Sequence, residues 1–456
     1  FWLKIFLSGL LEDDPIYTFS CRGYPRAEIS VVLCAVRAMD LEPAAELPVD
    51  AASAGLPFNK RDSLLSFSGV EVAGLNSAEL LDAAIRVVAY ASRLASEVQD
   101  RLITDGPSSL EKHDLSPMTV ADLGVQCLVT EFLGTVMPVK ENFRLMGEED
   151  ALHFEEKGVT KELIEIVRLL NRHFPFEDLA GRSGIRRQEF TVEDVMALLR
   201  RGSESGGNSG SFWVLDPIDG TKGFLRNSQY AIGLGLVVEG VPALGVMACP
   251  NLPPPGGDPT KRAVGPDAGY IFGGHSSWVG TVRLQPLLEM LQSRSSTPLG
   301  QMPWHEEALA LKVGDCCNLS EAILCESFES GHRDGDGIRP RSAQLKDLRV
   351  VRLDSMAKYG LVARGDAHVY LRGSHRSAYN EKLWDHCAAA LLVTAAGGRV
   401  TDLHGHELDF GAGRLLSRNQ GVLATNGVLH DEILAEISKL IEKDRRESLG
   451  EVTAVK

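Results

Sequence analysis

Residues 211–226 read Ser-Phe-Trp-Val-Leu-Asp-Pro-Ile-Asp-Gly-Thr-Lys-Gly-Phe-Leu-Arg, and this stretch decides the fold. It begins as a short apolar run that predicts a strand. Pro217 biases Asp216 towards extended geometry, so we expect the strand to end in a tight turn. Two carboxylates, Asp216 and Asp219, flank the Ile218 carbonyl in this turn. Because hard divalent cations such as Mg²⁺ prefer oxygen ligands, the stretch predicts a strand that ends at a metal site.

The next two residues suit a phosphate ligand. Gly220 lets the backbone approach a ligand closely, and Thr221 can cap a following segment and orient a water molecule. Backbone amides at such a turn would point at a phosphate. However, Asp-Pro-x-Asp-Gly is also ordinary turn chemistry, so this stretch alone does not distinguish a metal site from a plain turn. Three other motifs decide between the two.

Composition limits the classes of function. The chain has 456 residues, 44% hydrophobic and 24% charged, which predicts a globular protein with two domains or subdomains plus an extension. A net charge of −15 argues against nucleic-acid binding, which needs basic surface. It leaves room for a small phosphorylated substrate, whose charge bound metal ions can offset. The eight cysteines show no zinc-ligand or disulfide spacing, which favours a reducing, intracellular compartment.

The N-terminal part of the sequence carries no catalytic motif. The sequence begins with Phe1 rather than Met, and residues 1–11 are apolar but too short to span a bilayer. We interpret residues 1–78 as a weakly ordered extension, for which the remnant of a targeting segment is one explanation. The choice between cytoplasm, plastid and mitochondrion stays open. No stretch predicts a transmembrane helix, so we expect no membrane partner.

Three further acidic motifs lie far from the central turn. Asp122 follows Ser-Pro-Met-Thr-Val-Ala near the start of a predicted helix, Glu148 lies in Gly-Glu-Glu-Asp, and Asp385 follows Trp384 where another helix begins. Each has an ordinary explanation when it is taken singly, because helix starts favour carboxylates and acidic runs are usually solvated turns. Predicted strands and helices alternate along the C-terminal half, as expected of a layered α/β protein.

Taken together and in this order, the four motifs resemble those of the inositol monophosphatase superfamily of lithium-sensitive, Mg²⁺-dependent phosphatases. The chain looks most like the 3'(2'),5'-bisphosphate nucleotidases of that superfamily. The segments that carry this narrower likeness are Lys-Gly-Phe-Leu-Arg at 222–226, Gln-Tyr-Ala at 229–231, Cys-Pro-Asn-Leu-Pro at 249–253, Asp-Ser-Met-Ala-Lys-Tyr at 354–359, Tyr-Leu-Arg at 370–372 and Glu-Lys-Leu-Trp-Asp-His at 381–386.

The resemblance implies a fold, which is a layered α/β sandwich of the sugar-phosphatase type. An N-terminal α+β subdomain at residues 79–250 would carry most metal ligands. A C-terminal α/β subdomain at residues 251–446 would carry nucleotide-binding residues, and residues 447–456 would form a tail. We place the boundary near the Pro/Gly-rich loop at residues 250–266.

The resemblance also implies a metal site and a mechanism. Two or more Mg²⁺ ions would be bound by four carboxylates and one carbonyl, those of Glu148, Asp216, Ile218, Asp219 and Asp385. Asp216 would be shared between ions, and Asp122 together with Thr221 would activate the attacking water. The implied chemistry is in-line hydrolysis of a phosphomonoester without a covalent enzyme intermediate.

The implied substrate is a small bisphosphorylated nucleotide. Its contacts would be Gly220, Thr221, His332, Ser355, Lys358 and Arg372. The implied reaction converts 3'-phosphoadenosine 5'-phosphate to AMP and phosphate, in sulfate assimilation or nucleotide bisphosphate turnover, with 3'-phosphoadenylyl sulfate as a second candidate substrate. Two alternatives stay open: an inositol polyphosphate 1-phosphatase and a catalytically silent nucleotide-binding sensor. The sequence does not predict an oligomeric state.

Overall fold

The structure of the protein is a computed structural model that describes residues 70–105, 117–137, 143–149, 160–179, 189–328, 338–373 and 379–448. All of these residues belong to one compact unit, residues 59–456. Most of the expected N-terminal extension (residues 1–69) and most of the expected tail (residues 449–456) lie outside the described residues. Among the residues described, no helix is both long enough and apolar enough to cross a bilayer.

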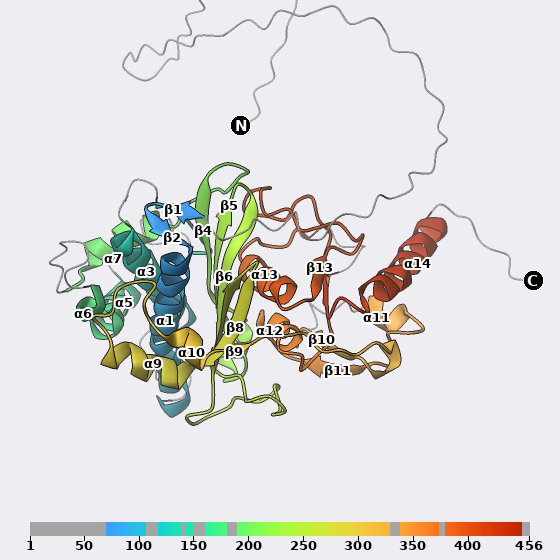
Figure 1. Ribbon diagram of the computed structural model, residues 1–456, viewed down its shortest axis with the longest axis horizontal. Coiled ribbons are helices and arrows are strands. Elements are labelled where there is room, and N and C mark those ends of the chain that lie inside the picture. Colours follow the sequence, from blue (N-terminus) through green and yellow to red (C-terminus); the bar gives the residue numbers. More distant parts are fainter. Residues whose placement is uncertain are drawn as a thin grey trace, which may run out of the picture. The chain divides into compact units, whose positions relative to one another are not determined.

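Helical layers and two β-sheets alternate through this unit, in the order helix, sheet, helix, sheet, helix (Figure 1). In the described part of the chain the larger sheet has seven strands, which follow one another in sequence order. They are β3 (Leu145–Gly147), β4 (Ser211–Asp219), β5 (Ala231–Val238), β6 (Val241–Cys249), β7 (Tyr270–His275), β8 (Trp278–Arg283) and β9 (Leu309–Ala310). β3 and β4 are parallel, and the other neighbours are antiparallel. The predicted α/β layered sandwich is confirmed.

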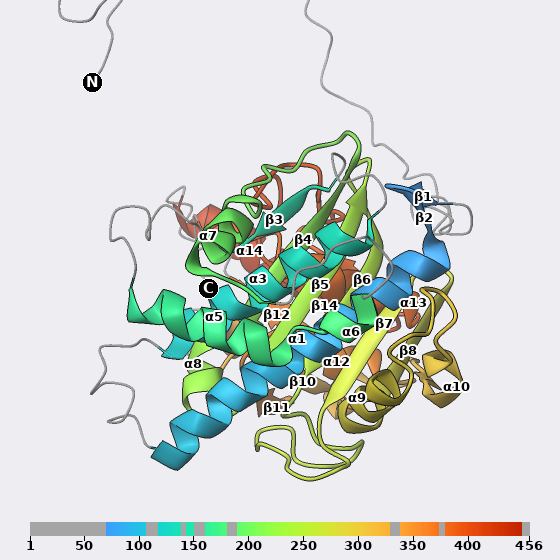
Figure 2. The ribbon, with the colours of Figure 1, turned by 90° about the vertical axis from the view of Figure 1, so that its left-hand side faces the viewer.

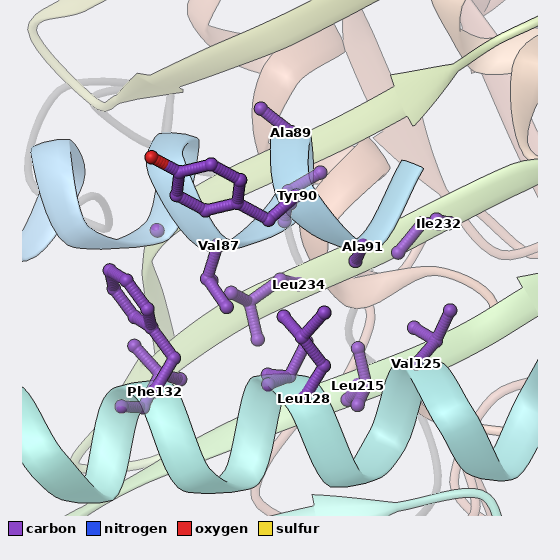
Figure 3. Close-up of a cluster of buried hydrophobic side chains, with 14 of the residues drawn as sticks. Val87, Ala89, Tyr90, Ala91, Val125, Leu128, Phe132, Leu215, Ile232 and Leu234 are labelled. Atoms are coloured by element: carbon purple, nitrogen blue, oxygen red, sulfur yellow. The ribbon is translucent and has the colours of Figure 1, made fainter. Parts of the chain in front are cut away.

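One face of the larger sheet is covered by helices of the first outer layer (Figure 2). They are α1 (Ser77–Asp105), α3 (Pro117–Val136), α5 (Lys161–His173), α6 (Phe176–Leu179) and α7 (Val192–Arg200), with α9 (Leu284–Ser293) and α10 (Trp304–Glu307) near β8. Figure 3 shows how α1 and α3 bury side chains such as Val87 and Leu128 against Leu234 of β5. This is the main hydrophobic core, and it holds the helix that carries Asp122 against β4.

The middle layer lies between the two sheets and contains α12 (Ala357–Ala363) and α13 (Cys387–Ala395). α13 packs against β5, β6 and β7 on one side and against β13 and β14 on the other. It meets a sheet on both sides, and all of its residues except Thr394 are apolar. Glycine in the larger sheet permits the close approach: a Cβ at Gly245 would lie 2.5 Å from the Ala388 carbonyl oxygen.

The smaller sheet has the strand order β11-β10-β12-β14-β13 among the described residues. The strands are β10 (Ile323–Glu326), β11 (Arg349–Arg352), β12 (Val369–Arg372), β13 (Arg399–Thr401) and β14 (Val422–Thr425). β10 pairs in parallel with both β11 and β12, so these three strands end at the same edge. The outer face of this sheet packs on α11 (Ile338–Arg341) and α14 (His430–Ser448). The remaining elements are β1 (Glu71–Val72), β2 (Leu75–Asn76), α8 (Thr221–Leu225) and the 3₁₀ helix η2 (Leu319–Glu321).

The two sheets divide the chain between β9 and β10, later than the boundary that we placed near residue 250. The Pro/Gly-rich loop connects β6 to β7, which are adjacent antiparallel strands of one sheet, so it is a long connection within the sheet. Likewise, the hairpin formed by β1 and β2 lies inside the range that we expected to be an extension. Its Val72 and Leu75 side chains are buried in the main core.

Candidate metal centre

Asp216 and Asp219 lie at the end of β4, where the strand contains a bulge. Asp216 pairs with Gly233 of β5 and Asp219 pairs with Ala231, so three steps along β4 match two along β5. Residues three apart in a regular strand point to opposite faces of the sheet. The extra residue corrects this alternation, and both carboxylates can therefore face the same site.

Gly220 follows the bulge, and both its backbone conformation and the space around it require a glycine. Its φ is +86°, in the left-handed region, and a Cβ there would lie 2.8 Å from the Ser355 Cβ. The tight contact joins β4 to the turn after β11. In that turn Ser355 has a φ of +69°, and the Met356 backbone N–H donates to Asp219 Oδ2. Thr221 is exposed and opens α8.

Glu148 reaches the site because β3 and β4 are parallel. Met146 pairs with Val214 and Gly147 with Leu215, so the next residue, Glu148, lies beside Asp216. Asp122 lies in the early part of α3, which packs on β4, and its side chain is buried. Burial and the negative charges of Glu149 and Glu148 raise the pKa of Asp122 well above its ordinary value. The structure therefore brings together acids from three separate motifs.

Three of these carboxylates have raised pKa values, because they are buried and lie close to other negative charges. Burial, then Glu148, Asp219 and Asp385, raise the pKa of Asp216 well above its ordinary value. Burial and the charge of Asp385 raise the pKa of Glu148 to about 8. Burial and Asp385 also raise the pKa of Asp219 to about 6, against the opposing effects of Lys358 and Arg372. The protein alone thus leaves this group of acids short of positive charge.

The donor set fits divalent metal ions. Asp216 Oδ1 is buried and has no hydrogen-bond partner among the described residues. Buried polar atoms are normally paired, so an orphan carboxylate oxygen surrounded by other carboxylates indicates a cation ligand. All donors at the site are oxygens, which favours a hard ion such as Mg²⁺ over a softer transition metal. Glu148, Asp216, the Ile218 carbonyl, Asp219 and Asp385 are the groups that can supply them.

Asp385 lies in the turn before α13 and is held by an arginine. Arg372 Nη2 donates to Asp385 Oδ2 at 2.9 Å, and Arg372 Nε lies 2.8 Å from Glu381 Oε2. On the far side, His386 Nε2 lies 3.3 Å from Glu381 Oε2, and His386 Nδ1 lies 2.7 Å from the Tyr359 hydroxyl. The resemblance implied separate roles for the two residues, Asp385 as a metal ligand and Arg372 as a substrate contact. The structure joins them in one buried network.

Glu381, Asp385 and His386 also have ligand atoms within 4.8 Å of one another, in an arrangement that can hold a metal ion. Their charges, however, already have partners. Burial alone would raise the pKa of Glu381, but the His386 hydrogen bond and the Arg372 charge bring it to about 2. The raised pKa values of Glu148, Asp216 and Asp219 make these carboxylates the better candidates for binding the ions, whereas Glu381 supports Arg372.

The resemblance assigned Lys358 and His332 to the substrate, but only Lys358 lies among the described residues, and it binds the backbone of its own turn. Lys358 is buried, and its Nζ donates to the Ser355 carbonyl at 2.6 Å and to the Leu353 carbonyl at 3.3 Å. Burial lowers the pKa of Lys358 to about 8 although Asp219 opposes the shift. In this structure Lys358 therefore fixes the turn that holds Asp219. His332 lies outside the described residues.

Gln126 is a residue of the site that sequence analysis missed. It lies one helical turn after Asp122 on α3 and is buried. Its side-chain amide donates to the Glu149 carbonyl at 2.9 Å and accepts from the Glu149 N–H at 3.1 Å. A Cβ at Gly147 would lie 2.3 Å from Gln126 Oε1, so Gly147 makes room for this clamp. The i, i+4 spacing from Asp122 was the only signal in the sequence.

Arg414 is the second missed residue, and it connects two segments that carry candidate metal ligands. Arg414 Nη2 donates to the Gly147 carbonyl at 2.7 Å, next to Glu148, and its guanidinium carbon lies 4.8 Å from the centre of the Trp384 ring, next to Asp385. Its backbone carbonyl accepts from the Leu383 N–H at 3.1 Å. No sequence motif signals this role, because the three segments are far apart along the chain.

Replacing Gln126 with methionine is expected to weaken metal binding about tenfold or more, the usual result of losing a group that orients a ligand. The change leaves the Glu149 N–H and carbonyl without their partner and frees the backbone that positions Glu148. Titration of activity with Mg²⁺ should show a higher half-saturating concentration, with most of kcat recovered at saturation. The control is Gln285→Met on the exposed face of α9, which should change neither quantity. An unchanged half-saturating concentration in the Gln126 variant would contradict this role.

Metal stabilisation is expected to increase with pH. The folded, metal-free protein holds protons on Glu148 up to about pH 8 and on Asp219 up to about pH 6, whereas the unfolded chain releases them near their ordinary values. Its stability therefore falls as pH rises through this window, and a bound cation restores it. Tm measured with EDTA and with excess Mg²⁺ should differ more at about pH 8 than at about pH 5.5, at matched ionic strength. A difference independent of pH would contradict the assignment.

Comparison with known proteins gives the following matches. The model of the inositol monophosphatase family matches residues 76–442. The chain is 37% identical over 379 residues to "3'(2'),5'-bisphosphate nucleotidase" of Oryza sativa, covering 82% of this chain and 98% of that protein. It is 34% identical over 337 residues to the protein of the same name in Emericella nidulans, covering 73% and 91%. Inositol monophosphatase-II of Staphylococcus aureus MSSA476, a solved structure, matches at 16% identity with a TM-score of 0.46, covering 83% of this chain and 99% of that one.

Proposed function

Since this chain belongs to the inositol monophosphatase family, we propose that it is a Mg²⁺-dependent phosphatase that converts 3'-phosphoadenosine 5'-phosphate to AMP and phosphate. One observation carries the proposal. Acids from separate motifs gather around Asp216, whose buried Oδ1 lacks a partner among the described residues. The names of the curated relatives in Oryza sativa and Emericella nidulans support a bisphosphate nucleotide as the substrate.

The metal ligands in this proposal are Glu148, Asp216, the Ile218 carbonyl, Asp219 and Asp385. Mg²⁺ ions bound there would neutralise the phosphate, lower the pKa of the attacking water and stabilise the leaving oxygen. The protein's part is to hold the ligands in place. Met356 fixes Asp219, Arg372 fixes Asp385, and the Gln126 clamp fixes the backbone beside Glu148.

Asp122 is the proposed proton acceptor, and Thr221 orients the water with its hydroxyl. Burial and neighbouring acids raise the pKa of Asp122, which makes its carboxylate a stronger base than an exposed aspartate. A bound cation favours the ionised form, so the same residue is deprotonated when the substrate arrives. Thr221 at the start of α8 lies next to Gly220, which itself carries no side chain.

The second phosphate and the sugar are proposed to lie where β10, β11 and β12 end. Ser355 follows β11, and Arg372 is the last residue of β12. The guanidinium of Arg372 has five donors; it binds Glu381 and Asp385 and also hydrogen-bonds Tyr370 and Tyr379, so a phosphate would take a remaining donor or replace one of the tyrosine hydroxyls. Lys358 acts on the substrate through the Ser355 turn that it holds.

A phosphate-release assay tests the proposal against its alternatives. The substrates are 3'-phosphoadenosine 5'-phosphate, 3'-phosphoadenylyl sulfate, inositol 1-phosphate and inositol 1,4-bisphosphate, each with Mg²⁺ and with EDTA. We expect the highest kcat/KM with 3'-phosphoadenosine 5'-phosphate, dependence on Mg²⁺ and inhibition by Li⁺. A higher kcat/KM with inositol 1,4-bisphosphate would identify an inositol polyphosphate 1-phosphatase. Nucleotide binding without release of phosphate would identify a silent sensor.

A further inference from the structure

An exposed aromatic ring lies at the edge of the smaller sheet that carries the proposed substrate site. In open α/β sheets, ligands bind outside the carboxyl ends of parallel strands. β10, β11 and β12 are parallel and end together. Two residues beyond β10 comes Phe328, two beyond β11 comes Asp354, and β12 ends at Arg372. Phe328 therefore shares this edge with the turn that contains Ser355.

Phe328 is held in place by Arg226. This arginine directly follows α8, the short helix after β4 of the larger sheet. The guanidinium carbon of Arg226 lies 4.6 Å from the centre of the Phe328 ring. Arg226 Nη2 donates to Asp354 Oδ2 at 2.6 Å. Asp354 is itself packed against α8, because a Cβ at Gly223 would lie 2.9 Å from its side chain. A short chain of contacts thus runs from the ring to the Asp216–Thr221 turn.

The side chain of Phe328 is 50% exposed even with the Arg226 contact in place. The Arg226 cation, which is itself paired with Asp354, holds the ring in this position. A half-exposed phenylalanine lacks the stabilisation that full burial of its side chain would give. It does provide a flat apolar surface on the same edge of the smaller sheet as the turn that contains Ser355. Aromatic rings of this kind bind nucleotide bases by stacking, with little dependence on which base is present.

We propose that Phe328 is a stacking platform for the nucleotide base, and that Arg226, anchored by Asp354, fixes the orientation of its ring. This inference rests on the proposed nucleotidase function and adds a base-recognition site to it. The platform distinguishes nucleotides from sugar or inositol phosphates, because only nucleotides carry a planar base. The metal site, by contrast, contacts only the scissile phosphate and its surroundings.

Binding and turnover of paired ligands test the platform. Calorimetry measures the Kd of AMP and of ribose 5-phosphate, and kinetics measures kcat and KM for 3'-phosphoadenosine 5'-phosphate, with the full chain and Mg²⁺. Phe328→Ala should weaken AMP binding and raise KM by about five- to 150-fold, the range for losing one stacked base. It should leave kcat and ribose 5-phosphate binding unchanged. Phe328→Trp should retain AMP binding, and Leu309→Ala, at an exposed apolar position on β9, is the matched control.

The outcomes separate the platform from the proposed function. Equal losses for AMP and ribose 5-phosphate in Phe328→Ala, or no loss for either, would overturn the platform. If the wild-type chain binds AMP much better than ribose 5-phosphate and loses that preference in Phe328→Ala, the platform is supported. That result would hold even if the phosphate-release assay assigned another reaction to the metal centre.

Discussion

Asp216→Asn is expected to lower kcat by at least about a hundredfold, because a shared metal ligand contributes several kcal/mol of charge stabilisation to the transition state. Asp216 lies in a group of acids and has a raised pKa, and its Oδ1 has no hydrogen-bond partner among the described residues, so it depends on bound cations for its charge. Asparagine has the same shape without the charge. The metal-free variant should therefore fold as well as the wild type, while Mg²⁺ should no longer raise its Tm.

The control for this variant is Asp258→Asn, which removes a carboxylate from an exposed loop. It should leave kcat and the effect of Mg²⁺ on Tm unchanged. Both quantities are measured on the same preparations, so loss of folding is separated from loss of chemistry. A folded Asp216→Asn protein with near-normal Mg²⁺-dependent turnover would show that the metal ligands have been assigned incorrectly.

Arg372→Met is expected to reduce both stability and activity. Removing the guanidinium leaves Glu381 and Asp385 without their buried partner, a change that typically costs about 3–5 kcal/mol in the free energy of unfolding. It also releases Asp385, so kcat/KM for adenosine 3'-phosphate should fall by about ten- to a hundredfold. A further loss of about tenfold or more is expected with 3'-phosphoadenosine 5'-phosphate, because a charge-assisted contact to the second phosphate disappears.

Comparing the two substrates separates the two roles of Arg372. The loss that both substrates share reports the support of Asp385, and the excess loss with the bisphosphate reports contact with the second phosphate. Equal losses would remove Arg372 from the substrate site. Unchanged stability together with unchanged activity on adenosine 3'-phosphate would contradict its support of Asp385. Arg399→Met, which breaks an exposed pair with Asp431, should cost at most about 1 kcal/mol.

The sequence predicted a strand that begins near residue 211 and is followed by paired aspartates because local rules determine this pattern, although β4 continues through Pro217 to Asp219 instead of ending at Asp216. Asp122, Glu148 and Asp385 were candidates through the family resemblance and not through local rules. An apolar run, a proline and paired aspartates specify a strand end in the same way wherever they occur. The layered fold followed from the alternation of elements and from the family resemblance. The bulge between Asp216 and Asp219 was not predicted, since the register of β4 depends on its pairing with β5.

The supporting residues were beyond sequence reasoning because their partners are distant along the chain. Arg414 and Gly147 are 267 residues apart, and Gln126 and Glu149 are 23 apart. The motif at residues 354–359 also suggested that its lysine, Lys358, binds a phosphate. Only the structure reveals that Lys358 donates to the carbonyls of its own turn. The boundary near residue 250 rested on a Pro/Gly-rich loop, and composition does not tell a connection within a sheet from a linker between subdomains.

The most direct test of the central proposal follows the phosphorus atoms of the substrate. ³¹P NMR of 3'-phosphoadenosine 5'-phosphate incubated with the full chain and Mg²⁺ should show the 3'-phosphate signal replaced by inorganic phosphate, with the 5'-phosphate of AMP intact. The same sample with EDTA, and one containing the Asp216→Asn variant, should show no change over that time. Release of the 5'-phosphate, or an equal rate of release with EDTA, would contradict the account.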